Sequence, residues 1–169
     1  MKREERLLRL YNRIYSRAKW VYVLKTVGKI SVALVALAFV SLLAFVLATK
    51  GVTECLRVVL SALIPFLAVS AMRLIFNWKR PYEVVPFAPF EIMRRERKEG
   101  KAFPSRHVFS AFLIGVLILP YSAVLGTLVL ILGAYISAER VLIGIHFPRD
   151  VIAGAIIGII SGALGILIL

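Results

Sequence analysis

The chain has 169 residues, 60% of them hydrophobic, a mean hydropathy of +0.88 and a formal net charge of +13. A chain this apolar cannot be an ordinary soluble domain, because it has too little polar surface to cover one, and its length fits a single domain. We therefore predict an all-α integral membrane protein, a five-span helical bundle with six helices if an N-terminal amphipathic helix is counted.

The N-terminal residues 1–26 are predicted to form a basic amphipathic helix at the membrane interface, ahead of a transmembrane domain at 27–169. Within residues 3–20, arginines recur every four positions opposite an apolar stripe, which is the pattern of a helix lying in the interface. The arginines are Arg9, Arg13 and Arg17, and the stripe is Leu7, Tyr11, Ile14 and Ala18. This pattern indicates an anchor rather than a site.

Five apolar runs follow, and about 20 apolar residues suffice to cross a bilayer. The predicted spans are 27–48, 55–78, 104–119, 123–142 and 149–169. In the last span, glycines four residues apart favour close packing against another helix. They are Gly154, Gly158 and Gly162.

The one sizeable loop lies at 82–103. Its proline-broken aromatic part, 84–90, is expected to dip into the interface, and its charged part, 94–99, to form a solvated and partly helical face. Two predicted crossings separate the N-terminus from this loop. The loops at 78–106 and 143–149 are therefore expected on the same face as the N-terminus.

Lysine and arginine are concentrated near that face. Nine of the 22 lie in residues 1–30 and eight more in residues 78–106. Basic clusters beside spans have two explanations: they set topology through attraction to anionic lipid, or they bind an anionic substrate. Nucleic acid is not expected as a partner, since the sequence offers no soluble fold with a groove for it.

Arg73 is unusual because it sits inside an apolar span, seven residues before Arg80. Seven residues are close to two helical turns, so the pattern predicts both guanidinium groups on one helix face, ~10 Å apart along the axis. They would repel each other unless an anion lay between them. The alternative is that Arg73 snorkels to the headgroups.

A second cluster opens the third span, where Pro104 fits the first turn of a helix. Ser105, Arg106 and His107 then fall where free backbone N–H groups and the helix dipole attract an anion. The third cluster lies at 140–150. It holds Arg140, His146 and Asp150, and the alternative reading is a short charged loop between two spans.

These residue types suit phosphoryl transfer. Three arginines, a serine and a helix N-terminus form a receptor for a tetrahedral oxyanion. Two histidines supply one nucleophile and one general acid, and an aspartate fixes the tautomer of the nearer imidazole. Metal ligation by the histidines and the aspartate is the competing interpretation, but three nearby arginines would repel a cation. The inventory favours metal-free transfer through a phosphohistidine, with no cofactor.

The three clusters resemble the motifs of the type 2 phosphatidic acid phosphatase superfamily of membrane lipid phosphatases. The family pattern is Lys-x6-Arg-Pro, then Pro-Ser-Gly-His, then Ser-Arg-x5-His-x3-Asp. This chain reads Arg73-x6-Arg80-Pro81, Pro104-Ser105-Arg106-His107 and Glu139-Arg140-x5-His146-x3-Asp150. The resemblance covers about residues 55–169.

The resemblance implies a role for each residue. His146 would attack phosphorus, held by Asp150, and His107 would protonate the departing lipid alcohol and later activate water. The phosphate oxygens would be bound by Arg73, Arg80, Ser105, Arg106 and Arg140.

Three positions depart from the family motifs. Arg73 replaces lysine, so a planar fork replaces a point charge. Arg106 replaces glycine, and its side chain is expected to point to the headgroup and to favour more anionic substrates such as pyrophosphates. Glu139 replaces serine, and it either pairs with a neighbouring arginine or weakens phosphate binding.

We predict an integral-membrane lipid phosphatase of a bacterial or archaeal cell membrane that hydrolyses a lipid phosphate monoester or pyrophosphate. A lipid phosphotransferase with the same intermediate, or a non-catalytic protein that binds anionic lipid, are the alternatives. Partners are the substrate and membrane lipids. The N-terminal charge favours a cytoplasmic site, whereas the resemblance favours an outward one.

Overall fold

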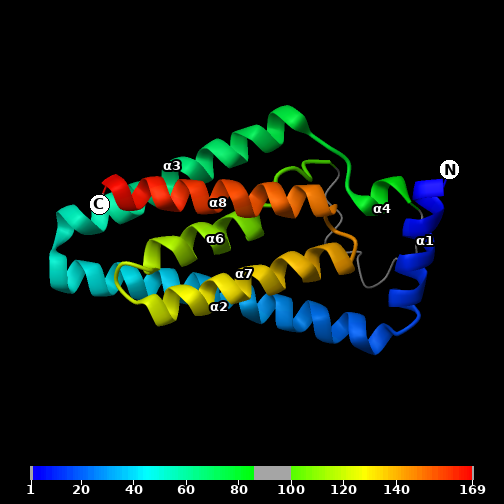
Figure 1. Cartoon of the computed structure of the whole chain (residues 1–169), viewed down its shortest axis with the longest axis horizontal. Helices are drawn as coiled ribbons and strands as arrows, with labels where there is room; N and C mark the ends of the chain where they lie inside the picture. Colours follow the sequence, from blue (N-terminus) through cyan, green and yellow to red (C-terminus); the bar gives the residue numbers. More distant parts are fainter. Residues whose placement is uncertain (1, 86–99, 169) are drawn as a thin grey trace.

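The protein is a bundle of helices in a computed structural model that describes residues 2–85 and 100–168. The helices are α1 (Lys2–Tyr15), α2 (Ala18–Lys50), α3 (Val52–Phe76), α4 (Pro81–Val84), α6 (Arg106–Ile118), α7 (Ala123–Leu142) and α8 (Pro148–Ile168). Figure 1 shows α2, α3, α6, α7 and α8 along one direction, with α1 and α4 at the end opposite the C-terminus. The predicted all-α class is confirmed across the described ranges.

The length of the helices distinguishes four of them. Helices α2, α3, α7 and α8 are each long and apolar enough to cross a membrane. Helix α6 has 13 residues, which is about 20 Å of helix against the ~30 Å of a hydrocarbon core. The count of five spans therefore stays a prediction; the helix α7, Ala123–Leu142, covers the range predicted for the fourth span.

The predicted interfacial helix at 3–20 is not continuous. The chain turns at Ser16–Arg17, and α2 begins at Ala18, well before the predicted start of the first span. The turn lets α1 cross the end of the bundle (Figure 1), where the Tyr15 hydroxyl donates a 2.8 Å hydrogen bond to the Ile143 carbonyl. A tertiary contact thus overrides the helical periodicity of the sequence.

The prediction that Arg73 and Arg80 share one helix is wrong. Helix α3 ends at Phe76, because Asn77 takes a left-handed conformation with φ 40° and ψ 39°. Arg80 is extended, as a residue before proline prefers, and α4 starts at Pro81. The third predicted span is also shorter, since Pro104 precedes the helix and Ser105 is its N-cap residue.

Glycines in α8 bring it close to α6, as their spacing predicted. A Cβ atom on Gly154 would lie 2.7 Å from the Ser105 carbonyl oxygen, and one on Gly158 would lie 2.5 Å from that of Phe109. Only glycine permits so close an approach. The close approach fixes the position of the first turn of α6 along α8. The N-terminus and the loop at 143–147 lie at the same end of the bundle, as expected (Figure 1). Most of the predicted aromatic and charged loop parts, 86–99, lie outside the described residues.

Candidate active site

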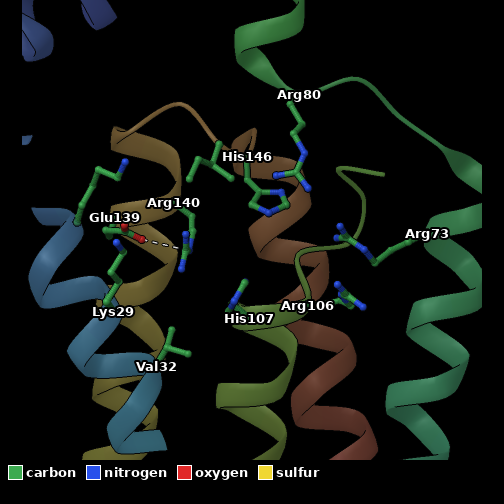
Figure 2. Close-up of a pocket in the computed structure, with 11 residues that line it drawn as sticks. Lys29, Val32, Arg73, Arg80, Arg106, His107, Glu139, Arg140 and His146 are labelled. Carbon is green, nitrogen blue, oxygen red and sulfur yellow. Dashed lines mark ion pairs between the residues drawn. The ribbon is translucent and has the colours of Figure 1, made fainter. Parts of the chain in front are cut away.

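A cavity of about 400 Å³ opens at the end of the bundle where α1 and α4 lie. It is lined by Lys25, Lys29, Val32, Arg73, Arg80, Arg106, His107, Glu139, Arg140, Ile145 and His146 (Figure 2). Six of the eight predicted site residues are in this set. The other two, Ser105 and Asp150, are fully buried beside it.

The two histidines reach the cavity from different elements. His107 is the second residue of α6, and His146 lies in the loop between α7 and α8 (Figure 2). This loop is held by backbone bonds, since the His146 and Ile145 N–H groups both donate to the Arg140 carbonyl at 3.1 Å. His146 is only 2% exposed. The imidazole is thus positioned before any substrate binds.

Asp150 supports His146 from the first turn of α8. Its Oδ2 atom lies 3.6 Å from His146 Nδ1 and accepts a 2.9 Å hydrogen bond from the Phe147 N–H. The 3.6 Å separation exceeds a hydrogen bond, but such contacts in empty sites commonly tighten when substrate binds. The backbone carbonyl of Asp150 also accepts from the Ser105 N–H at 2.9 Å. One residue therefore ties the two histidine-bearing segments together.

Arg73 and Arg80 enter from α3 and from the segment before α4. Arg73 is 7% exposed and donates from Nη1 to the Pro104 carbonyl at 2.5 Å, so it does not snorkel. Arg80 donates from Nε to the Gly100 carbonyl at 3.1 Å. Each guanidinium has five N–H donors, so these anchoring bonds leave others to face the cavity. Both side chains point toward the histidines in Figure 2.

Arg140 and Glu139 form an ion pair at the opposite wall, with Nε and Oε2 3.2 Å apart. Glu139 is 2% exposed and packs against α2, where a Cβ atom on Gly28 would lie 2.7 Å from its Cδ atom. Of the two roles predicted for this departure from the family motif, the structure therefore shows the pairing with arginine. The pair also orients Arg140 toward the cavity (Figure 2).

Ser105 and Arg106 are neighbours in the chain, but only Arg106 lines the cavity. The Ser105 hydroxyl is buried without a hydrogen-bond partner in the described structure. Arg106 lines the main cavity, and its guanidinium carbon lies 6.0 Å from the Phe66 ring centroid. The expectation that Arg106 points to the lipid headgroup stays a prediction.

Two lysines of α2 were missed by the sequence analysis. Lys25 and Lys29 line the cavity, and Figure 2 shows Lys29 on the side opposite Arg73. In the sequence they are two of the nine basic residues of 1–30, for which topology and the binding of an anionic substrate were both open explanations. Their spacing of four residues places them on one helix face, which was the available signal, but nothing in the sequence showed that this face meets Arg140.

Two smaller cavities adjoin the main one. An apolar cavity of about 280 Å³ shares Val32, Arg106 and His107 with it. The remaining residues of that cavity are Val35, Ala36, Phe66, Ser110, Ile114 and Ile136. A second, basic cavity of about 300 Å³ is lined by Ser70, Arg73, Leu74, Arg80, Lys101 and Arg106. The first of these offers space for hydrocarbon next to His107.

Burial determines the protonation of His146. It lowers the pKa of this imidazole to about 4, and Arg80 lowers it further, while Asp150 opposes the shift. The ring is therefore neutral at pH 7, which leaves one nitrogen lone pair free to react.

This pKa can be measured, because the chain has only two histidines. In a His107→Gln variant, NMR should show a single imidazole that titrates well below 6.5. Adding Asp150→Asn should lower that pKa further, because the neighbouring negative charge is removed. A titration near 6.5 in both proteins would contradict the buried, charge-coupled placement of His146.

The contact of α1 with the His146 loop leads to a further prediction. Tyr15 is buried in a cluster with Ile143 and Ile145, and its hydroxyl bonds the Ile143 carbonyl. Tyr15→Phe should reduce kcat about fivefold with little change in KM, because one hydrogen bond of about 1 kcal/mol positions the loop. Tyr11→Phe is the matched control, since its 3.4 Å bond to the Val141 carbonyl is longer. Equal effects of both changes would rule out this positioning role.

Comparison with known proteins agrees with this fold. The family model described as "PAP2 superfamily" matches residues 33–169. The crystal structure of LpxE from Aquifex aeolicus superposes with a TM-score of 0.68 at 22% identity, covering 95% of this chain and 94% of that one. A PAP2 type phosphatidylglycerolphosphate phosphatase from Bacillus subtilis gives 0.70 at 18% identity, covering 97% and 83%.

One sequence relative is more similar over a shorter stretch. The bacitracin transport permease protein BcrC of Bacillus licheniformis is 36% identical over 78 residues, which are 45% of this chain and 38% of that protein. The match therefore spans well under half of that relative.

Proposed function

The chain belongs to the PAP2 superfamily, and on this premise we propose that it is an integral-membrane lipid phosphatase that acts through a phosphohistidine on His146. One observation carries the proposal. Both histidines and four arginines line a single cavity that adjoins an apolar one, so a phosphate and a lipid chain can be bound together. The substrate class is a lipid phosphate monoester or diphosphate.

In the first step, His146 attacks phosphorus while the bond from phosphorus to the lipid oxygen breaks. Since Nδ1 of His146 faces Asp150, we assign the attack to Nε2. Arg73, Arg80 and Arg140 approach from both sides and would hold the phosphate oxygens, whose charge grows in the transition state. Donors fixed in advance in a partly dry site contribute strongly to such a step.

His107 serves as the general acid and base of both steps. It would donate a proton to the departing lipid oxygen, and in the second step it would take a proton from the water that attacks the phosphohistidine. The phosphorus–nitrogen bond then breaks and inorganic phosphate leaves. Asp150 stabilises the imidazole of His146 while that ring carries positive charge.

The reaction is proposed to need no metal ion. Among the described residues, no group of three or more His, Cys, Asp and Glu side chains is arranged to hold one, and the cavity is lined by six cationic side chains and one carboxylate. The four arginines that line the cavity would supply the charge stabilisation that a metal ion supplies in other phosphatases.

The test is phosphate release by the purified full chain in detergent. Phosphatidic acid, phosphatidylglycerol phosphate, an isoprenyl pyrophosphate and a lipid A phosphate would each be supplied with EDTA. We expect inorganic phosphate from at least one substrate at the rate seen without EDTA. Adding an acceptor lipid alcohol separates hydrolysis from phosphotransfer. The proposal fails if no substrate releases or transfers phosphate, and its metal independence fails if EDTA abolishes turnover.

A further inference from the structure

The wall of the main cavity holds one carboxylate among many cations. Six of the described side chains that line it are cationic, and Glu139 is the only acidic one among them. Cations that share a cavity repel one another while no anion is bound. An arginine in such a wall therefore turns away from its neighbours unless another group holds it in place.

Glu139 is placed to hold Arg140 in this way. Its Oε2 atom lies 3.2 Å from Arg140 Nε, and the two side chains are 2% and 12% exposed. Because the contact is made at Nε, the N–H groups of the two terminal nitrogens remain for an anion. In Figure 2 the dashed line marks this ion pair, and Arg140 lies between Glu139 and the two histidines. The pair thus fixes Arg140 on the phosphate side of the wall.

The space that Glu139 occupies is provided by Gly28 of α2. A Cβ atom on Gly28 would lie 2.7 Å from Glu139 Cδ and 2.8 Å from its Oε1. Since Glu139 is 2% exposed, its side chain has little room to move aside. One turn earlier in each helix, the Tyr135 hydroxyl of α7 donates a 3.2 Å hydrogen bond to the Leu24 carbonyl of α2. Helix α2 therefore packs on α7 directly against this carboxylate.

We propose that Glu139 is a positioning residue for phosphate binding, and that Gly28 is the position of α2 on which its placement depends. Glu139 keeps the donors of Arg140 aligned before a substrate arrives. The inference rests on the proposed function, in which Arg140 holds a phosphate oxygen. It applies to any lipid that carries the phosphate.

A carboxylate here has two opposite effects on a bound phosphate. Its charge repels the anion, whereas its ion pair aligns the N–H donors of Arg140. The repulsion is weak, because the guanidinium charge so close to the carboxylate cancels most of it at the phosphate. The other five cations supply the net positive charge, and donors fixed in advance contribute strongly to a charged transition state. The positioning effect therefore outweighs the repulsion.

The experiment is a double-mutant cycle on the purified full chain in detergent. The readout is kcat and KM for phosphate release from a lipid phosphate that the unmodified protein hydrolyses. Glu139→Gln keeps the shape of the side chain and should lower kcat/KM about tenfold, with most of the loss in kcat. In an Arg140→Gln background the same change should cost less than about twofold, because the residue that it positions is gone. Equal losses in both backgrounds would overturn the positioning role.

Gly28→Ala tests the α2 side of the same arrangement. The added methyl group should displace the carboxylate from Arg140 and lower kcat/KM about as much as Glu139→Gln does. In a Glu139→Ser background the atoms that the methyl group would meet are absent, so Gly28→Ala should then have no further effect. A loss as large in that background as in the unmodified protein would overturn the part assigned to Gly28.

Tyr135→Phe is the matched control, because it removes a hydrogen bond between the same two helices without touching Arg140. It should leave kcat/KM within about twofold. Thermal unfolding of all variants measures any loosening of the contact between α2 and α7. If Tyr135→Phe lowered kcat/KM as much as Glu139→Gln, helix packing alone would explain both effects and the proposal would be overturned.

Calorimetry with inorganic phosphate separates this inference from the proposed function. Glu139→Gln should weaken phosphate binding about threefold. Tighter binding by Glu139→Gln would mean that the carboxylate acts only by repulsion, and this would overturn the inference. If the unmodified protein shows the expected dependence on Glu139 but releases phosphate from no lipid, the proposed function fails and the positioning role is kept. If it neither binds phosphate nor releases it, both fail.

Discussion

His146→Ala is expected to reduce phosphate release by at least about 1,000-fold, because removing a nucleophile from a preorganised site typically costs that much or more. Binding of the lipid should be largely kept, since the arginines that face the phosphate remain. Rates of phosphate release and lipid binding by the same purified protein measure both effects. The side chain is 2% exposed in a loop held by backbone hydrogen bonds, so the fold should tolerate the change.

Imidazole in the buffer provides a sharp control for this variant. The space left by the missing ring adjoins a cavity of about 400 Å³, so free imidazole should restore part of the turnover. It should not restore His146→Leu, whose side chain fills the space. Full turnover in His146→Ala without imidazole would remove this residue from the mechanism and favour the non-catalytic reading of the chain.

Asp150→Asn should have the second largest effect, a fall in kcat of about 100-fold to 10,000-fold at preserved folding. An amide has the size of the carboxylate, and its oxygen can still accept from the Phe147 N–H, now bonded at 2.9 Å. It cannot stabilise a positive imidazole, which was the contribution of the charge 3.6 Å from His146. Single-turnover kinetics measures the step directly.

Glu54→Gln is a matched control for Asp150→Asn, because Glu54 pairs with Arg57 at the start of α3 and does not line the cavity. It should leave kcat within about twofold. If Asp150→Asn instead lowered thermal stability and kcat together, with no shift in the His146 titration, the carboxylate would be a structural residue of the loop.

The sequence predicted the convergence of distant segments better than it predicted local geometry. The two histidines and the arginines were expected on one face, and the structure places them around one cavity. The shared helix of Arg73 and Arg80 was wrong because the left-handed turn at Asn77 ends α3 early. Periodicity shows which residues share a face only while the helix continues.

The α2 lysines and the break after α1 could not be predicted for a different reason. The place of Lys29 in the cavity wall depends on α2 packing beside Glu139, which is a property of the fold rather than of the surrounding sequence. The turn at Ser16–Arg17 likewise depends on where Ile143 lies, 128 positions away from Tyr15. Both the α2 lysines and the end of α1 were expected at the membrane surface. The reason is that lipid headgroups and a bound phosphate attract the same basic residues.

The glycine contacts between α6 and α8 have a consequence for how a lipid gains access. With backbone atoms nearly touching at Gly154 and Gly158, these helices cannot slide past or separate from each other without losing that fit. Helix α6 also packs far more extensively on α7 and α8 than on α2 or α3. We therefore expect a lipid to enter from the bilayer on the α2 and α3 side, where α6 is packed least, while the close contact of α6 with α8 is kept.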